Sequence, residues 1–293
     1  MDTSVLVSRR ELLLRTQNAD GGWGYFAGKR SWLEPTVYAM LALRAEAAAK
    51  SAVDRAWNLI RSLQLKDGGW KPCAAFNKST WVTSLAVTAC TVHGEDGAPF
   101  EAGVRWLLGT SGFESSTLIK IRKAVGLAAF ERETKWRGWP WMQDTAAWVE
   151  PTAQSVLALK KASHRYAKSE LIDRVTEGEK LLLAVRTRDG GWNAGNPVAA
   201  HVQQASYPET TALALLALQS AAPQDAIKLM RDSYGKTHMR MADAWTAVVL
   251  KTIGSEAPAG PVAGAPADLM IAAIECLGAP GGNARLLCEK ENG

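Results

Sequence analysis

The sequence predicts an all-α fold in which helical hairpins repeat around a closed ring, and two observations carry this prediction. The segments 17–23, 64–70 and 186–192 read alike: each ends in Asp-Gly-Gly-Trp and each follows an apolar pair at one fixed offset. Thirteen residues after Trp23 and Trp70 stands a threonine that opens a run of small and aliphatic residues. Self-similarity of this kind is the sequence signature of a repeat architecture.

The two helices of each unit differ in character, and the difference predicts which one lies outside. The first is amphipathic, as in residues 53–64, and such a helix lies at a surface with one face buried. Asp-Gly-Gly then ends it, because glycine accepts the left-handed conformation that stops a helix. The second is apolar nearly all round, as in residues 211–218, so we expect it to form the inner wall of the ring.

Worn copies extend the pattern along the chain. Trp139 marks a degenerate fourth loop, and Thr152 follows it by thirteen residues, whereas the gap from Trp192 to Thr211 is nineteen residues and indicates an insertion. Thr246 opens a fifth inner helix, which is not preceded by a recognisable Gly-Trp loop. One unit cannot bury its apolar face alone, so the units must stack or close. Inner helices are expected at 36–43, 84–89, 152–159, 211–218 and 246–250.

We expect a single domain over residues 1–278, with about eleven or twelve helices around the ring. Residues 117–130 are ambiguous, being either an inner helix of a worn repeat or an inserted helix. Residues 279–293 lie beyond the last repeat and are expected to form a flexible C-terminal tail.

Composition narrows the classes of partner. The 293 residues are 47% hydrophobic and 22% charged, with a net charge of +5, which is an ordinary globular balance. Lysine and arginine are scattered without the blocks that bind nucleic acid, so no nucleic-acid partner is expected. No signal peptide and no apolar stretch of membrane-spanning length is present, which predicts a cytoplasmic protein.

The repeat resembles one that is known. Gln-x-x-x-Gly-x-Trp after an apolar pair, then a threonine opening an Ala/Leu helix, is similar to the glutamine–tryptophan repeat of squalene and oxidosqualene cyclases. Protein prenyltransferase β-subunits and the complement thioester domain share the same toroid. The resemblance covers residues 5–278. It implies an α/α toroid (an α6/α6-type barrel) built from helical-hairpin repeats with Gly-Trp loops.

The resemblance also places a candidate acid. Class II terpene cyclases protonate an alkene with the middle Asp of Asp-x-Asp-Asp-Thr-Ala, at the start of an inner helix. Aligned on that Thr-Ala, this chain reads Trp-Val-Glu-Pro-Thr-Ala over residues 148–153. Glu150 stands at the position of the acid, while Trp148 and Pro151 replace the flanking aspartates. No Asp-Asp pair occurs in the sequence, so the aspartate-rich magnesium and diphosphate motif of class I terpene synthases is absent.

The zinc ligands of protein prenyltransferases do not carry over. Aligned on Thr211, the position of the ligand Cys holds Glu209 and that of the ligand Asp holds Tyr207, while Trp245 replaces the expected His. A tetrahedral zinc site needs thiolate or imidazole ligands, so we expect neither a metal nor a cofactor. The Gly-Cys-Gly-Glu-Gln thioester signature of complement is also missing.

Three glutamates, Glu34, Glu150 and Glu209, therefore stand in homologous places, each two residues before a threonine. One interpretation is structural, because Glu-Pro-Thr starts a helix well and a carboxylate suits its positive end. The other is functional, with the carboxylates ringing one mouth of the barrel beside aromatic faces that tolerate a cation. Candidate substrate-binding aromatics are Trp32, Trp148, Tyr207, Trp81, Trp141 and Trp245.

A physical conflict limits the role of Glu150 as an acid. A general acid must hold its proton near neutral pH, which requires burial or a like charge. A helix N-terminus has the opposite effect and keeps a carboxylate ionised. Only convergence of Glu34, Glu150 and Glu209 in a dry cavity would raise the pKa of one of them enough.

Two classes of function follow from the sequence. The first is a terpene-cyclase-like isomerase or cyclase that holds an isoprenoid or another apolar chain, with possible peripheral membrane contact. The second is a non-catalytic toroid that binds a protein or peptide, or a degenerate prenyltransferase subunit. A wide apolar cavity favours a small molecule, whereas a plugged ring with an exposed apolar patch favours a partner surface. The basic cluster 120–123 is either a solvated helix face or a contact for phosphate or membrane.

Overall fold

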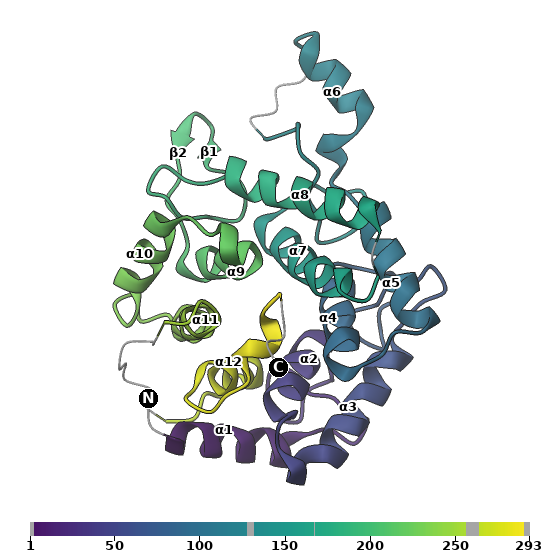
Figure 1. Cartoon of the computed structure of the whole chain (residues 1–293), viewed down its shortest axis with the longest axis vertical. Helices are drawn as coiled ribbons and strands as arrows, with labels where there is room; N and C mark the ends of the chain where they lie inside the picture. Colours follow the sequence, from purple (N-terminus) through teal and green to yellow (C-terminus); the bar gives the residue numbers. More distant parts are fainter. Residues whose placement is uncertain (1–2, 128–131, 167, 256–263, 290–293) are drawn as a thin grey trace.

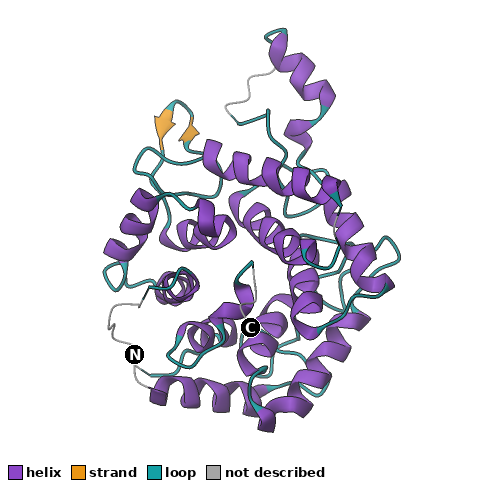
Figure 2. Cartoon of the chain, in the orientation of Figure 1, coloured by secondary structure: helices purple, strands orange, loops and turns teal. Residues whose placement is uncertain are grey.

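Helices form nearly all of the regular structure in the computed structural model, which describes residues 3–127, 132–166, 168–255 and 264–289. These residues contain twelve α-helices, four short 3₁₀ turns and one two-stranded hairpin (Figures 1 and 2). Six helices form an inner ring: α2 (Leu33–Leu43), α4 (Thr83–His93), α7 (Val149–Ser163), α9 (Pro208–Leu218), α11 (Arg240–Thr252) and α12 (Leu269–Gly278). Five lie outside it: α1 (Thr3–Thr16), α3 (Lys50–Ser62), α5 (Ala98–Gly109), α8 (Ser169–Ala184) and α10 (Gln224–Ser233).

The inner helices close into a ring because α12 packs against both α11 and α2 (Figure 1). In α9 every residue from Thr210 to Leu218 is buried, and in α2 every residue but Glu34 is buried. A helix that is apolar all round can be stable only if it is surrounded by protein. The prediction of an inner wall made by the second helix of each pair is therefore confirmed, and α12 is a sixth inner helix that the repeat pattern did not reveal.

The repeated threonines hold each loop to its inner helix through one buried hydrogen bond. The backbone N–H of each loop tryptophan donates to the threonine hydroxyl that opens the following inner helix, at 2.8–3.0 Å. The indole Nε1 of the same tryptophan donates to a carbonyl of an outer helix at 2.6–2.9 Å. All four indoles are at most 1% exposed. The pairs are Trp23 with Thr36, Trp70 with Thr83, Trp139 with Thr152, and Trp192 with Thr211.

The glutamine of the repeat links each unit to the next one. Gln17 Nε2 donates to the carbonyls of Gly21 and of Ala52 on α3, and Gln64 Nε2 donates to those of Gly68 and of Pro99 on α5. Gly21 and Gly68 have φ near +90°, and a Cβ at either position would lie within 2.7 Å of a carbonyl oxygen of that next helix. Both the left-handed backbone and the close approach therefore require glycine.

In the degenerate fourth loop an arginine from the following helix provides this link. Arg174 on α8 is 1% exposed, and its guanidinium lies 3.4 Å from the centroid of the Trp139 ring. Its terminal nitrogens donate to the carbonyls of Arg137, Thr110 and Gly138. A stacked and multiply bonded guanidinium can satisfy several loop carbonyls at once. The fourth unit thus keeps the geometry of the others without their sequence.

Two insertions interrupt the ring. The nineteen-residue gap holds the hairpin of β1 (Val198–Ala199) and β2 (Val202–Gln203), which confirms an insertion there. Helix α6 (Thr117–Ala124) buries none of its residues and projects away from the ring (Figure 1). Of the two interpretations of 117–130, an inserted helix is the correct one for residues 117–127, and residues 128–130 lie outside the described part.

We expected residues 279–293 to form a flexible tail, but the described part of this segment is packed against the ring. Residues 279–289 pack against the C-terminal ends of the inner helices, with Ala284 and Leu287 at most 2% exposed. Lys251 Nζ donates to the carbonyls of Ala279 and Gly282, and Gln219 Nε2 donates to that of Leu287. The segment therefore covers that end of the ring, and residues 290–293 lie outside the described part. Within the described residues no helix is long and apolar enough to cross a bilayer.

We predict that Thr83→Val lowers the free energy of unfolding by about 1–3 kcal/mol, because it leaves the buried N–H of Trp70 without an acceptor. Urea denaturation measures the effect. Thr176→Val is the matched control, since the Thr176 hydroxyl bonds only to a carbonyl of its own exposed helix surface, and it should change the midpoint little. Equal effects of the two substitutions would contradict the structural role of the threonine.

Candidate functional site

The three candidate glutamates lie in the first turns of three inner helices, at the same end of the ring. Glu34 is on α2, Glu150 on α7 and Glu209 on α9, and each side chain is only partly accessible. Because α2, α7 and α9 start from the same threonine contact, these helices share one register and their first turns meet at one mouth. The structure thus brings together residues that are 59 to 175 positions apart.

Burial and nearby negative charges raise the pKa of two of these carboxyls. The pKa of Glu150 is raised to about 8, first by burial and then by the neighbouring charges of Glu34 and Glu209. The pKa of Glu34 is raised to about 7, again by burial first, with a further increase from Asp268 and a decrease from a hydrogen bond with Tyr25. No described cation contributes to either shift. A carboxyl with such a pKa keeps its proton at neutral pH, as a general acid must.

Two further observations define the polar groups at the mouth. The Tyr25 hydroxyl donates to Glu34 Oε2 at 2.5 Å. Oε2 of Glu209 is buried and accepts no hydrogen bond within the described residues. A buried oxygen without a donor usually awaits a water or a ligand. The mouth therefore offers one carboxyl with a tyrosine partner and one carboxylate oxygen with a free lone pair.

A layer of larger side chains closes the ring one helical turn below the glutamates. Tyr38 and Gln154 follow Glu34 and Glu150 by four residues, which places them on the same helix faces. Gln154 Nε2 donates to the Tyr38 hydroxyl at 2.9 Å, and the Tyr38 and Trp245 rings meet edge to face at 5.3 Å. All three are at most 4% exposed. These contacts cross the ring between α2, α7 and α11, so a ligand would sit above this layer rather than pass through the ring.

Aromatic residues precede the inner helices that carry the glutamates. Trp32, Trp148 and Tyr207 are the residues immediately before α2, α7 and α9, and Tyr207 is 48% exposed. Trp81 lies just before α4, two residues before Thr83, at the position that holds a glutamate in α2, α7 and α9. Its ring meets that of Trp141 edge to face at 4.8 Å. Of the six candidate aromatics, Trp245 alone lies in the layer below.

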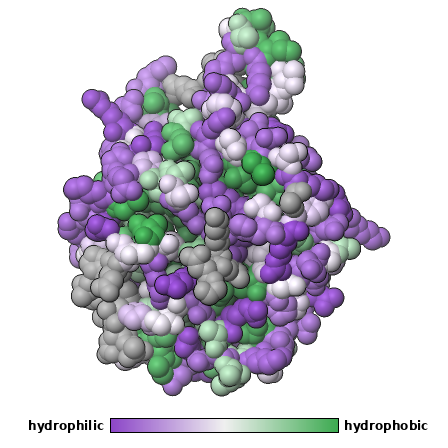
Figure 3. Space-filling view, viewed as in Figure 1, coloured by the Kyte–Doolittle hydropathy of each residue, from purple (hydrophilic) through white to green (hydrophobic). Residues whose placement is uncertain are grey.

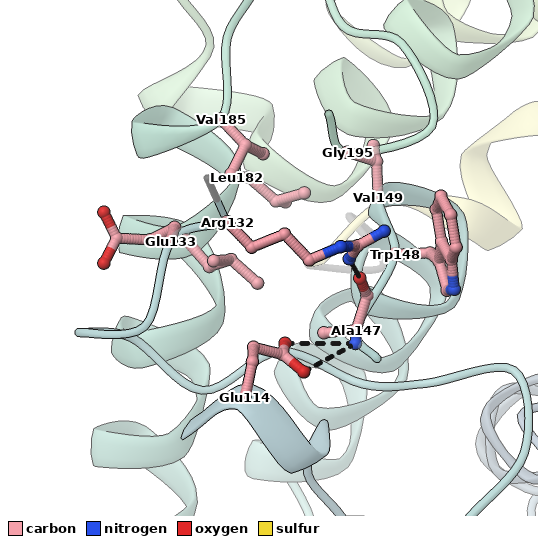
Figure 4. A pocket seen from close by; sticks show the side chains of 10 residues that line it. Glu114, Arg132, Glu133, Ala147, Trp148, Val149, Leu182, Val185 and Gly195 are labelled. Carbon is pink, nitrogen blue, oxygen red and sulfur yellow. Dashed lines mark hydrogen bonds between the residues drawn. The ribbon is translucent and has the colours of Figure 1, made fainter. Parts of the chain in front are cut away.

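A hollow on the outer side of Trp148 shows how the start of α7 is held (Figure 4). The Arg132 guanidinium lies 4.2 Å from the centroid of the Trp148 ring and donates to the carbonyl of Ala147 at 2.7 Å. The carboxylate of Glu114 accepts from the N–H of Ala147 at 3.0 Å. Both backbone polar groups of Ala147 are thus fixed by side chains. Arg132 and Glu114 therefore position Trp148, and through it Glu150, without reaching the mouth.

No set of three or more His, Cys, Asp or Glu side chains in the described part of the chain is arranged to hold a metal ion. The raised pKa values of Glu34 and Glu150 favour a role for these two carboxyls in proton transfer.

Comparisons with known proteins place the fold but not the family. The sequence matches no protein-family model and no curated protein. Among solved structures, the type II terpene cyclase MstE from Scytonema, in complex with its substrate geranylgeranyl dihydroxybenzoate, is 19% identical with a TM-score of 0.55 over 93% of this chain and 76% of that one. The fold is an α/α toroid. The predicted fold class is confirmed, and the likeness concerns the α/α-toroid fold rather than the squalene cyclases in particular.

Glycosidases are equally similar to this toroid. Endoglucanase Cel10 from Klebsiella pneumoniae, a family 8 glycosyl hydrolase, is 17% identical with a TM-score of 0.56 over 92% of this chain and 97% of that one. An α-amylase from Clostridium perfringens is 10% identical with a TM-score of 0.57, over 85% and 82% of the two chains. At such identities the likeness concerns the fold alone, and the chemistry of this toroid has to be argued from its own residues.

Sequence reasoning missed several residues of this site. Tyr38 and Gln154 carried a usable signal, because each follows a candidate glutamate by one helical turn on an inner helix. Asp268 accepts from the N–H groups of Met270 and Ile271 at the start of α12, a helix without a Gly-Trp loop. Tyr25 comes from the first Gly-Trp loop, and nothing in its surrounding sequence indicates a partner in α2.

We predict that Glu150→Gln stabilises the protein at high pH by on the order of 1–3 kcal/mol. The native carboxyl keeps its proton up to about pH 8, whereas the unfolded one loses it near 4.5. The native state therefore binds more protons across this window, and the wild-type protein loses stability as the pH rises through it. Glutamine imitates the protonated form and removes this loss.

Urea midpoints at pH 5 and pH 9 measure the effect. The control is Glu170→Gln, since Glu170 also lies in the first turn of a helix but is exposed. The two variants should differ from wild type equally at pH 5 and diverge at pH 9. A Glu150→Gln variant that is destabilised at pH 9 would show that the carboxylate form is the favoured one.

Proposed function

We propose that the protein binds an uncharged, apolar ligand of the isoprenoid class at the mouth of the ring and isomerises or cyclises it by acid catalysis, with Glu150 as the acid. The observation that carries this proposal is the convergence of Glu34, Glu150 and Glu209 where no described cation offsets their charge. The ligand class is supported by a toroid of similar fold, the Scytonema terpene cyclase, whose substrate bears a geranylgeranyl chain.

The proposed step transfers one proton and returns it. The Glu150 carboxyl gives its proton to one carbon of an alkene, which leaves a carbocation on the ligand and a carboxylate on Glu150. The indoles of Trp81 and Trp148 and the unpaired Oε2 of Glu209 stabilise this cation electrostatically. A neighbouring C–H of the ligand then loses a proton to a carboxylate of the mouth. The product is an isomer of the substrate, so no co-reactant is needed.

The layer of Tyr38, Gln154 and Trp245 limits how the ligand can be held. It is buried and internally bonded, so the end of a chain would rest on it while the rest leaves past the exposed Tyr207. The ligand would therefore insert one end at a time, with its reacting alkene near Glu150.

Glycoside hydrolysis is a second candidate, and one observation favours it. The family 8 glycosyl hydrolases match over 96–97% of their own length, whereas the terpene cyclase matches over 73–76%. A glycosidase needs one protonated and one ionised carboxyl on either side of the bond. Glu150, with its raised pKa, would be the acid, and Glu209 would be the partner carboxylate.

One experiment separates the two candidates. We expect native mass spectrometry to show a bound molecule after exposure of the purified protein to squalene or another uncharged linear isoprenoid. We expect Glu150→Gln to keep this adduct but to lower conversion, followed by gas chromatography, by about 10²-fold or more. Glu170→Gln, an exposed first-turn glutamate, is the control.

Other outcomes would reject the proposal. Release of reducing sugar from a β-1,4-glucan, abolished by Glu150→Gln, would favour the glycosidase. An unchanged isoprenoid conversion after replacement of all three glutamates by glutamine would exclude the mouth as the site. Absence of any adduct would favour a toroid that binds a protein partner.

A further inference from the structure

Helix α6 is the one helix of the described chain that contributes nothing to the core. None of its residues is buried, whereas each of the other eleven α-helices contributes residues to the core. It extends beyond the outer helices, and hydrophobic side chains gather at its outer end (Figures 1 and 3). An isolated helix of eight residues has marginal stability in water. We therefore expect a binding partner to cover its exposed apolar side chains.

Three exposed apolar side chains of α6 and of the residue that follows it lie on one face. Leu118, Ile121 and Val125 are spaced by three and four residues, the spacing that aligns side chains along one side of a helix. They are 63%, 56% and 60% exposed, and Leu127 just beyond them is 77% exposed. Leu127 and Leu118 are the two most exposed large hydrophobic residues of the described chain. Such a cluster at the tip of a projection marks an interaction surface.

The charge of the same segment selects the kind of partner. Residues 117–127 contain Lys120, Arg122 and Lys123 and no acidic residue. Lys123 turns back and donates to the carbonyl of Arg132 and to the Thr134 hydroxyl, which anchors the base of the projection. Lys120 and Arg122 are exposed beside the apolar face. A short helix with apolar residues on one side and cations around them fits the interface of an anionic lipid bilayer.

We propose that residues 117–127 are a membrane-docking element that inserts Leu118, Ile121, Val125 and Leu127 into an anionic bilayer, with Lys120 and Arg122 at the headgroups. Long basic side chains can lie along the apolar surface and keep their charge at the headgroups. This proposal is independent of the proposed function, because α6 lies outside the ring and shares no residue with the mouth.

Co-sedimentation with vesicles tests the proposal on the purified full-length chain. We expect binding to vesicles of phosphatidylcholine with 30% phosphatidylglycerol. The affinity for vesicles of phosphatidylcholine alone should be lower by about tenfold or more. Leu118→Ser combined with Ile121→Ser should abolish binding to both. Because these side chains are exposed, the circular dichroism spectrum and the melting temperature should not change.

Matched controls distinguish this element from charge or apolar surface in general. Ile172→Ser removes an equally exposed residue of α8 and should leave binding unchanged. Lys120→Glu with Arg122→Glu should lower binding to anionic vesicles about tenfold or more, whereas Lys66→Glu with Lys78→Glu, the same change of charge elsewhere, should not.

Two results would overturn the proposal. Equal binding of wild type and the Leu118→Ser, Ile121→Ser variant would exclude α6 as the docking element. No vesicle binding, together with a dimer in sedimentation velocity that the same variant converts to monomer, would show that α6 is covered by a second copy of the chain.

Discussion

The structure depends on one buried hydrogen bond that is repeated around the ring, from the backbone N–H of a loop tryptophan to the hydroxyl of a threonine at the start of an inner helix. The bond fixes the axial position of each inner helix relative to its loop, and the indole of the same tryptophan fixes the loop to an outer helix. A buried N–H left without an acceptor costs the full desolvation of that group. The repeated bond therefore sets one register for α2, α4, α7 and α9.

That register has an electrostatic consequence. Residues two before each threonine are brought to one mouth, where three of the four are glutamates, and burial there raises the pKa of Glu34 and of Glu150. The helix N-termini oppose this effect, because their positive ends favour the ionised carboxylate. The interaction with the helix dipole is screened by solvent and is worth about 0.3–1 kcal/mol at exposed sites. At Glu150 burial and the charges of two glutamates outweigh it. The conflict between helix dipole and proton retention is thus resolved in favour of the proton.

Much of the ring could be predicted because short sequence patterns determine its loops and inner helices. The Gly-Trp loops, the threonines thirteen residues on and the apolar inner helices each depend on neighbouring residues. What escaped prediction depends on contacts between distant residues. Arg174 replaces the repeat glutamine from the following helix, Asp268 starts a helix without a loop motif, and residues 279–289 pack across the ring by bonding to helix ends. The layer of Tyr38 and Gln154 crosses the ring between helices that are not neighbours, so its closure needed the structure.

The protonation of Glu150 tests this account most directly. Infrared difference spectra between wild type and Glu150→Gln isolate the C=O stretch of the protonated Glu150 carboxyl, and a pH series follows its loss. The account predicts that this band persists through neutral pH and disappears with a midpoint near pH 8. A band that disappears near pH 4.5, the ordinary value for a glutamate, would show that the three carboxylates do not share a dry site and would remove the basis for acid catalysis at the mouth.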